Sequence, residues 1–197
     1  SLAILAQVVS LVFAIPMGML AAYKRGTAVD LATVSISLLG TAIPGFLLSM
    51  FFMLFFGVYL QWLPVAGYAP MAQGLGEHLR YLALPALSLG VVQAAYITRM
   101  TRSALLDVLY KNYIRTARAK GLRESAILFG QALKNAAPTI LTVVGQSFGS
   151  LVTGTIVTET IFNIPGLGML TMSSINQRDV FVIQGVVLFV TVIYVLV

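Results

Sequence analysis

The chain has 197 residues, of which 59% are hydrophobic and only 9% are charged, and its mean hydropathy is +0.96. Because a soluble domain carries about 25% charged residues, this composition excludes a soluble globular protein. The absence of cysteine excludes disulfides and thiolate metal sites, and a single histidine, His78, excludes a histidine metal cluster.

Long uncharged apolar runs alternate with charged segments along the chain. A helix needs about 20 mainly apolar residues to cross the hydrocarbon core of a bilayer. Because the runs are continuous rather than alternating, they predict helices and not a barrel. In chain order, the predicted spans are residues 3–22, 31–59, 81–98, 138–158 and 180–197. The second is long enough to be tilted or kinked.

Both ends of the chain lie within apolar runs, and the first residue is Ser1 rather than Met. We therefore expect a fragment, or the ordered core, of a longer chain. The first run has no basic n-region and no visible cleavage site, so it is not a signal peptide. The expected fold class is all-α, a polytopic transmembrane helical bundle in a single domain that covers residues 1–197.

The basic residues gather on one side of the predicted bundle. Loops 23–30 and 99–137 hold every Lys and Arg except Arg80 and Arg178. The positive-inside rule places these two loops in the cytoplasm and the segments with Arg80 and Arg178 outside. The first span then runs inward, which implies an earlier span upstream of Ser1.

The charge by itself indicates topology and the proximity of anionic lipid. A nucleic-acid interface is not expected, because a reader of single strands places aromatic residues among its cations. Only Tyr110 and Tyr113 lie among the cations of this chain.

Small and polar residues form stripes on the predicted spans, such as Ser10, Ala14, Gly18 and Ala22 at intervals of four on the first. Stripes of this kind are typical of close helix packing, and polar ones also suit the wall of a translocation pathway. The candidate pathway residues are Gln93, Thr142, Gln146, Ser150 and Thr153. No span carries a charge near its middle, which argues against a proton relay, a voltage sensor or an ion-coupled carrier.

The loop 99–137 is the most informative segment of the chain. Helix-forming residues lie on both sides of Gly121, and a glycine there fits a helix C-cap or a tight turn. We expect two helical pieces that break at Gly121-Leu122. A loop of this length with helices of its own is more than a connector, so we interpret it as a docking element for a cytoplasmic partner.

The segment Tyr113 to Leu122 reads YIRTARAKGL. It resembles the coupling loop of permeases from binding-protein-dependent ABC importers, and residues 116–121 match the Thr-Ala-Arg-Ala-Lys-Gly motif of the dipeptide, oligopeptide and nickel branch. The general family motif, Glu-Ala-Ala-x-x-x-Gly, is only partly kept. Arg115 stands at its Glu position and Thr116 at its first Ala position.

Further segments resemble the same branch and keep its order. Residues 62–67 (WLPVAG) resemble its outer-loop motif, residues 132–136 (ALKNA) a stretch after the coupling loop, and residues 159–168 (ETIFNIPGLG) its Glu-x-x-Phe-x-x-Pro-Gly-Leu-Gly segment. The resemblance covers essentially the whole chain. It is to the first of the two permease subunits of the branch, which carries an additional N-terminal span.

This resemblance implies a type I permease fold and a transmembrane subunit of an ATP-driven importer in a bacterial or archaeal inner membrane. The implied solutes are di- or oligopeptides delivered by an extracytoplasmic binding protein. Nickel, glutathione or another small solute is the alternative within the family. The implied partners are a second homologous permease, two ABC ATPases, the binding protein and membrane lipid, with no nucleic acid.

No enzyme activity, catalytic residue, metal site or cofactor is expected on this chain. It contains no Gly-x-x-x-x-Gly-Lys-Ser/Thr phosphate loop, so ATP and Mg are expected on the partner ATPases. Two other classes stay open, namely a secondary transporter or channel without an ATPase, and a scaffold that recruits proteins through the basic loop. The lack of charges within the spans and the helical loop disfavour the transporter or channel.

The resemblance also implies residue roles. A coupling helix at about 112–121 is expected to contact the ATPase through Arg115, Thr116, Ala117, Arg118, Ala119, Lys120 and Gly121. The alanines allow close approach, and the cations suit acidic groups or helix C-termini of the partner. The alternative is that these cations only hold the loop at the membrane face.

On the outer side, we expect a gate or a contact with the binding protein at Glu159, Pro165, Gly166, Arg178 and Asp179. The alternative for Glu159 is an exposed carboxylate at the membrane interface. Residues 165–168 are expected to break a short outer helix, and His78 is expected on the surface.

Overall fold

The computed structural model describes residues 1–196, apart from the side chain of Gln73, so the last residue of the predicted span 180–197 lies outside the described part. Within that part the chain is helical and contains no strand, which confirms the all-α prediction. The α-helices are α1 (Leu2–Tyr23), α2 (Ala28–Ala42), α3 (Gly45–Phe52), α4 (Leu75–Leu109), α5 (Asn112–Ala119), α6 (Glu124–Ala126), α7 (Leu133–Phe162), α8 (Leu167–Gln177) and α9 (Val180–Leu196). Two π-helical segments, η1 (Met53–Tyr59) and η3 (Ile127–Ala132), and a 3₁₀ turn, η2 (Met71–Gln73), complete the series.

Three helices are long and apolar enough to cross a membrane: α1, α4 and the continuous helix Glu124–Phe162 formed by α6, η3 and α7. The predicted span 31–59 is interrupted, since α2 ends at Ala42 and α3 begins at Gly45. The break falls at the Ile43-Pro44 dipeptide, where the proline disfavours helical backbone in the residue before it. Helix α9 is apolar but shorter than these spans.

Two spans run well beyond the ends predicted for them. Helix α4 continues to Leu109, past the charges at Arg99 and Arg102, and the helix that contains α7 begins at Glu124. Charge does not end a helix, because a helix ends where a cap or a residue such as Gly or Pro stops the hydrogen-bond series. The loop expected at 99–137 is therefore largely a continuation of the two spans, with α5 between them.

The described chain divides into two compact units. Unit 1 contains residues 1–9, residues 43–92 and the chain from residue 146 onward, and unit 2 contains residues 10–42 and 93–145. Helices α1, α4 and α7 each contribute one part to each unit.

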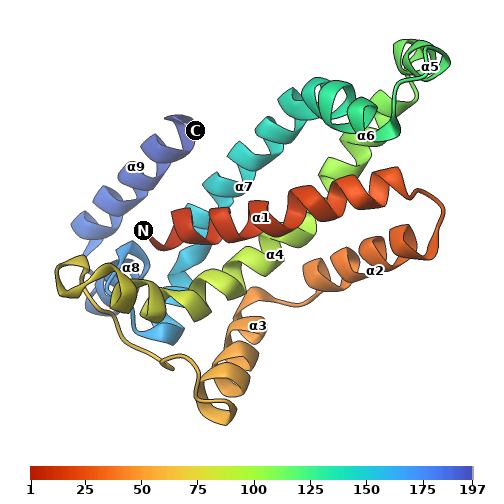
Figure 1. The fold of residues 1–197 in the computed structure, drawn as a ribbon. Coiled ribbons are helices and arrows are strands. Elements are labelled where there is room, and N and C mark those ends of the chain that lie inside the picture. Colours follow the sequence, from red (N-terminus) through yellow and green to blue (C-terminus); the bar gives the residue numbers. More distant parts are fainter. Residues whose placement is uncertain (197) are drawn as a thin grey trace. The chain divides into compact units, whose positions relative to one another are not determined.

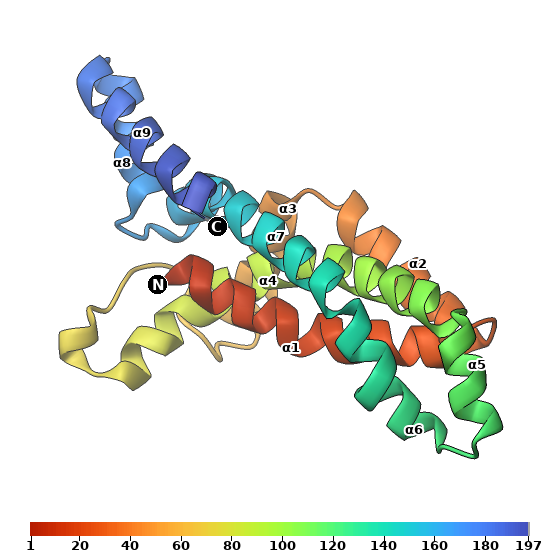
Figure 2. The ribbon, with the colours of Figure 1, turned by 90° about the horizontal axis from the view of Figure 1, so that it is seen from above.

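Unit 1 has its own apolar core. Its buried members are Leu2, Leu82, Leu84, Ala86, Phe162 and Ile164. Helix α4 lies close to α1 at Gly90, where an added Cβ would meet Val9 at 2.7 Å. Helices α8 and α9 lie side by side (Figure 2).

His78, which we expected on the surface, is buried in unit 1 with only 2% of its surface exposed. Its Nδ1–H donates to the carbonyl oxygen of Ala69 over 2.7 Å, and its ring meets Tyr68 edge to face. The expectation was wrong because the segment before η2 folds over the start of α4 and covers the imidazole. The residues next to His78 in the sequence give no sign of this contact with Ala69.

Unit 2 contains α2, α5, α6 and η3, the C-terminal parts of α1 and α4, and the N-terminal part of α7. Its largest buried cluster is Met19, Ala22, Ala104, Leu105, Leu128, Ala132, Ala136 and Ile140. The small-residue stripe on α1 packs here, since Ala14 and Ala22 are buried and a Cβ at Gly18 would lie 2.8 Å from the Thr98 carbonyl oxygen. A short turn joins α1, drawn in red, to α2 (Figure 1).

A buried ion pair fixes α2 to α4 within unit 2. Arg102 donates from Nε to one Asp30 oxygen over 2.5 Å and from Nη2 to the other over 2.8 Å. The Gly26 N–H donates to the same carboxylate over 3.0 Å. Such fork-to-fork pairing sets the register of two helices as well as their distance.

Candidate functional site

Helix α5 is a short amphipathic helix that rests on unit 2 by one apolar side. Ile114 and Ala117 are buried and form a small cluster with Ile127 of η3, and Leu109 of α4 packs against it. Residues three apart share one side of a helix, so this pair sets which side of α5 faces inward. The cluster therefore holds α5 against the ends of two membrane helices.

The turn after α5 has the predicted glycine. Gly121 has φ +78, and its N–H donates to the Arg118 carbonyl oxygen while the Leu122 N–H donates to the Ala117 carbonyl oxygen. This pair of bonds is the Schellman motif, in which the residue after the helix takes left-handed backbone. The predicted break at Gly121-Leu122 is confirmed.

An ion pair closes the same turn from outside. Arg118 donates from Nε and Nη2 to the two carboxylate oxygens of Glu124, over 2.7 and 3.2 Å. The Glu124 carboxylate raises the pKa of the Arg118 guanidinium above its ordinary value. Arg118 ends α5 and Glu124 begins α6, so each charge also suits the dipole of its own helix. Arg118 is therefore engaged within the chain.

The other predicted coupling residues divide into an outer and an inner group. Arg115, Thr116, Ala119 and Lys120 are exposed, whereas Ala117 is buried against the unit. Within residues 1–196 no carboxylate pairs with Arg115 or Lys120. The outer side of α5 therefore presents two unpaired cations next to a small alanine side chain.

On the other predicted side of the membrane, the Glu159 carboxylate binds the N-terminus of α8. It is only 8% exposed, and one carboxylate oxygen accepts from the Gly168 N–H over 2.7 Å and from the Met169 N–H over 3.4 Å. An exposed interfacial carboxylate, which was our alternative, is therefore wrong. A negative charge at a helix N-terminus satisfies free N–H groups and is favoured by the helix dipole.

Two glycines make room for this contact. A Cβ at Gly166 would lie 2.4 Å from the Glu159 carboxylate carbon, and a Cβ at Gly168 would lie 2.3 Å from the Ile156 Cα. The chain reaches this point because Asn163 takes left-handed backbone and the Ile164 N–H returns to the Glu159 carbonyl oxygen over 2.9 Å. The Glu-x-x-Phe-x-x-Pro-Gly-Leu-Gly motif thus encodes one tight helix–turn–helix, with Pro165 exposed beside the contact.

Arg178 and Asp179 do not join Glu159 in an ion pair in the part of the chain that the structure describes. Arg178 takes left-handed backbone at the end of α8, and the Asp179 N–H donates to the Ser174 carbonyl oxygen. Asp179 then caps α9 by accepting from the Val182 N–H over 3.2 Å. Their observed contacts are those of a connector between two helices.

The candidate pathway residues lie on long helices. In unit 1, Gln146, Ser150 and Thr153 of α7 are exposed and share one side of the helix by their spacing. In unit 2, Thr142 is exposed and donates to the Pro138 carbonyl oxygen, and Gln93 of α4 is half-buried. A polar pathway wall along α7 stays a prediction.

Residues 14–197 match the family described as binding-protein-dependent transport system inner membrane component. The chain belongs to this family. It is a multi-pass membrane protein, and the resemblance drawn from its motifs is confirmed.

Three relatives illustrate the range of the family around this chain. A probable peptide ABC transporter permease of Sinorhizobium fredii is 41% identical and covers 100% of this chain and 63% of the relative. A di/tripeptide transport system permease of Pseudomonas aeruginosa is 37% identical, over 94% of this chain and 61% of the relative. A glutathione transport system permease of Shigella flexneri is 37% identical over 100% of this chain and 61% of the relative. The chain thus spans less than two thirds of the length of these permeases.

Sequence reasoning missed the Asp30–Arg102 pair, which is the most buried ion pair among the described residues. The two residues are 72 positions apart. The only available signal was topological, since both fall in segments predicted on the same side of the membrane. Which cation meets Asp30 depends on how α2 and α4 pack.

Proposed function

We propose that this chain is the transmembrane core of a permease subunit of an ATP-driven importer in a bacterial or archaeal inner membrane. A second, homologous permease completes the pathway, and a binding protein delivers the solute on the outer side. Two ABC ATPases bind ATP and Mg in the cytoplasm and supply the energy. This chain itself is not an enzyme.

The observation that supports the proposal is that α5 is packed firmly against the neighbouring helices. A helix that transmits force from an ATPase must not slide on the membrane helices that it moves. The buried Ile114 and Ala117, the Schellman turn at Gly121 and the Arg118–Glu124 pair hold α5 by three independent contacts. Its outer side offers Arg115, Ala119 and Lys120 to a partner. The coupling role belongs to that side.

The solute that we propose is a di- or oligopeptide. The support comes from relatives whose names specify peptide or di/tripeptide transport at 37–41% identity over nearly the whole chain. Glutathione is the second candidate, because a permease named for its transport is also 37% identical. A glutathione importer would use the same architecture, since glutathione is itself a small peptide. Nickel and other small solutes are the remaining alternatives.

On the outer side, we propose that α8 acts as a gate or as a contact for the binding protein. Glu159 ties the N-terminus of α8 to α7, so a movement of α7 in unit 1 is passed directly to α8. Pro165, Gly166, Arg178 and Asp179 contribute by shaping the turns at the two ends of this helix. Exposed Gln146, Ser150 and Thr153 of α7 are the proposed pathway lining in the same unit.

The experiment that tests the proposal is a cross-link from a single cysteine at Ala119 of the full-length protein in native membranes. The exposed residue Ser173 on α8 serves as the matched cysteine control, because it is predicted on the opposite side of the membrane. We expect A119C, and not S173C, to link to an ABC ATPase in a yield that ATP changes. A labelled and accessible A119C without an ATPase product would favour a secondary transporter, a channel or a scaffold.

The solute is tested by uptake in cells that carry the complete importer. Labelled dipeptides, longer peptides, glutathione and Ni²⁺ should be compared under equal expression. We expect competition among the peptides and little effect of Ni²⁺. Uptake of glutathione with no competition by dipeptides would replace the peptide assignment by the glutathione alternative.

A further inference from the structure

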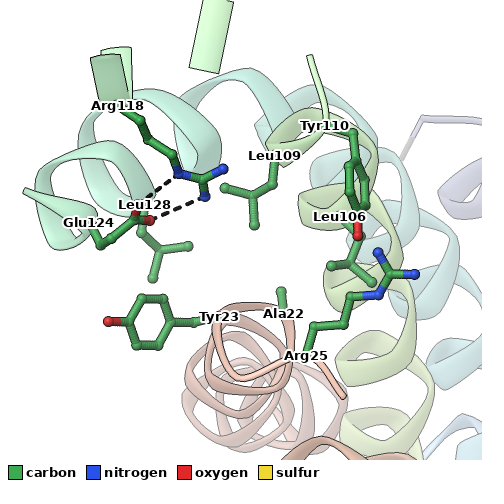
Figure 3. A pocket seen from close by; sticks show the side chains of 9 residues that line it. All are labelled: Ala22, Tyr23, Arg25, Leu106, Leu109, Tyr110, Arg118, Glu124 and Leu128. Carbon is green, nitrogen blue, oxygen red and sulfur yellow. Dashed lines mark hydrogen bonds and ion pairs between the residues drawn. The ribbon is translucent and has the colours of Figure 1, made fainter. Parts of the chain in front are cut away.

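Unit 2 contains a hollow lined by charged and apolar side chains, of which only Arg118 belongs to the predicted coupling residues. It has a volume of about 370 Å³ and lies where α1, the end of α4, α5 and α6 meet. Figure 3 shows Arg25 and Arg118 on opposite sides of it, with Glu124 bonded to Arg118. The lining charges leave one cation in excess, because a single carboxylate faces the two guanidinium groups.

Within residues 1–196, Arg25 is the lining cation without a close ion-pair partner, although its charge acts on the Asp30 carboxylate at longer range. Among the described residues no carboxylate lies within ion-pair distance of it, and its guanidinium carbon lies 4.9 Å from the centre of the Tyr110 ring. A cation–π contact of this kind orients a guanidinium without neutralising it. Arg118 uses two donor nitrogens on Glu124 and retains further N–H groups, since a guanidinium carries five.

An apolar groove adjoins this hollow. Tyr23 and Leu128 line both of them, and the groove has a volume of about 620 Å³. On one wall it is lined by α1 at Ile15, Pro16, Met19, Leu20 and Tyr23, and on the other by Ser125, Leu128, Phe129 and Leu133. Its α1 wall covers two helical turns, which is about 12 Å along the axis. Phe129 is 64% exposed at its edge.

We propose that the hollow and the groove together form a binding site for one anionic glycerophospholipid of the cytoplasmic leaflet. The phosphate would accept hydrogen bonds from Arg25, while Arg118 adds positive charge on the opposite side of the hollow, and one acyl chain would lie along α1 in the groove. The site matches the charge and polarity of such a lipid, since the hollow with Arg25 and Arg118 adjoins the apolar groove as the headgroup of the lipid adjoins its acyl chains. Basic pockets beside membrane helices on the cytoplasmic side recognise anionic headgroups in this way.

The predicted depth of the site in the bilayer also matches that of a phospholipid headgroup. Helix α1 is an apolar span up to Tyr23, and Arg25 follows two residues later. Tyrosine is favoured at the interface of a membrane, and arginine reaches the headgroup level there. A soluble phosphate would occupy only the hollow beside Arg25, whereas a phospholipid would occupy the hollow with its phosphate and the groove with an acyl chain.

Binding of lipid to the full-length protein in detergent can be measured by native mass spectrometry. We expect palmitoyl-oleoyl phosphatidylglycerol to bind about tenfold more tightly than the matching phosphatidylcholine, because hydrogen bonds to charged groups are worth roughly that factor. Arg25→Gln should remove most of this preference. Lys24→Gln is the matched control, because it removes the same charge from the neighbouring residue, which lines neither part of the site.

A purely diffuse attraction would weaken equally in both variants, by about fivefold for each cation, and equal losses would overturn the proposal. Equal binding of the two lipids in the unmodified protein would also overturn it. Glycerol phosphate, added as a competitor, should displace little of the lipid. If it displaces phosphatidylglycerol at equal concentration, the site binds a soluble phosphate instead.

The groove is tested by Ser125→Trp, which places an indole among the apolar lining residues. We expect about a tenfold loss of affinity for the long-chain phosphatidylglycerol and no change for its dihexanoyl analogue. A parallel loss of both lipids would contradict the acyl-chain assignment. Arg25 and Ser125 lie outside the coupling residues, so cross-linking from Ala119 should persist in these variants and failure of one proposal leaves the other standing.

Discussion

The turns at the two ends of the long helix Glu124–Phe162 are held by different kinds of contact. The turn at Gly121 lies on the surface of unit 2 and is closed by an ion pair whose partners, Arg118 and Glu124, are 43% and 44% exposed. The turn before α8 in unit 1 is closed by the buried carboxylate of Glu159, which accepts from backbone N–H groups. Solvent therefore reaches the carboxylate of the first turn, whereas the carboxylate of the second is only 8% exposed.

This difference indicates different mechanical roles. A turn held by an exposed pair can exchange that pair for a contact with another protein at little loss of free energy. A turn held by a buried carboxylate cannot exchange its contacts in this way, because each buried group left without a partner would lower the stability of the protein by about 1–3 kcal/mol. We therefore expect the Gly121 turn to adapt to a partner and the α8 turn to move as a unit with α7.

The largest effect is expected at Gly168. Gly168→Ala places a Cβ 2.3 Å from the Ile156 Cα, and because backbone cannot move aside as a side chain can, we expect a loss of about 3 kcal/mol. Thermal unfolding of the purified full-length protein measures it. Gly154→Ala on α7 is the control, since nothing lies within 4 Å of that position. An unfolding temperature equal to that of Gly154→Ala would show that the α8 turn is looser than described.

The next effect is expected at Glu159. Glu159→Gln keeps one acceptor oxygen but removes the charge at the N-terminus of α8, so we expect a loss of about 1–2 kcal/mol. Glu77→Gln, at a carboxylate that is 54% exposed, should change stability by less than about 0.5 kcal/mol. Thermal unfolding and the labelling rate of a cysteine at Ser173 both report the change. Equal stability of the two variants would remove the distinction drawn between the two turns.

An effect of similar size is expected at Gly121, where φ is +78. Gly121→Ala should lose about 1–2 kcal/mol, because L-residues are disfavoured in left-handed backbone. Gly130→Ala, at a helical glycine with open space around it, should be neutral or slightly stabilising. Gly121→Pro should abolish transport while the protein stays inserted, because proline fixes φ near −65° and lacks the N–H that bonds Arg118. Normal uptake with Gly121→Pro would refute the coupling assignment.

The smallest effect is expected for the ion pair at the Gly121 turn. Arg118→Gln should lose less than about 1 kcal/mol, and less again at high salt. Glu124 raises the pKa of Arg118, so at neutral pH the guanidinium keeps its charge, and this charge is lost only as pH rises above the ordinary arginine pKa. Salt and not pH is therefore the useful variable. Arg115→Gln is the control, and a salt-independent loss with Arg118→Gln would show that the pair is less accessible than its exposure implies.

Much of the fold could be predicted from local sequence because the membrane imposes simple rules. Apolar runs predicted where the long helices lie, and Gly121 predicted the break after α5. The exact ends of α4 and α7 could not be predicted, because Arg99, Arg102 and Lys134 mark where a helix leaves the hydrocarbon and not where it stops. The Ile43-Pro44 break was visible only as the excess length of the span 31–59.

The candidate site shows the same division. The motif at residues 113–122 predicted a short helix that ends at a glycine turn, and the motif at 159–168 marked the turn before α8. Sequence did not indicate that Ala117 faces inward, that Arg118 is engaged by Glu124, or that Glu159 is buried. These depend on which side of a short helix meets its neighbours.

Sequence alone therefore determined the class of protein, the apolar helices and the two glycine-containing turns. Each follows from the chemistry of adjacent residues, through burial in lipid, helix periodicity or left-handed backbone. Only the tertiary structure decided the pairing of Asp30 with Arg102, the burial of His78 and the contact of Arg25 with the ring of Tyr110. Those contacts join residues far apart in the chain, and their energy depends on distances that arise only when the helices pack.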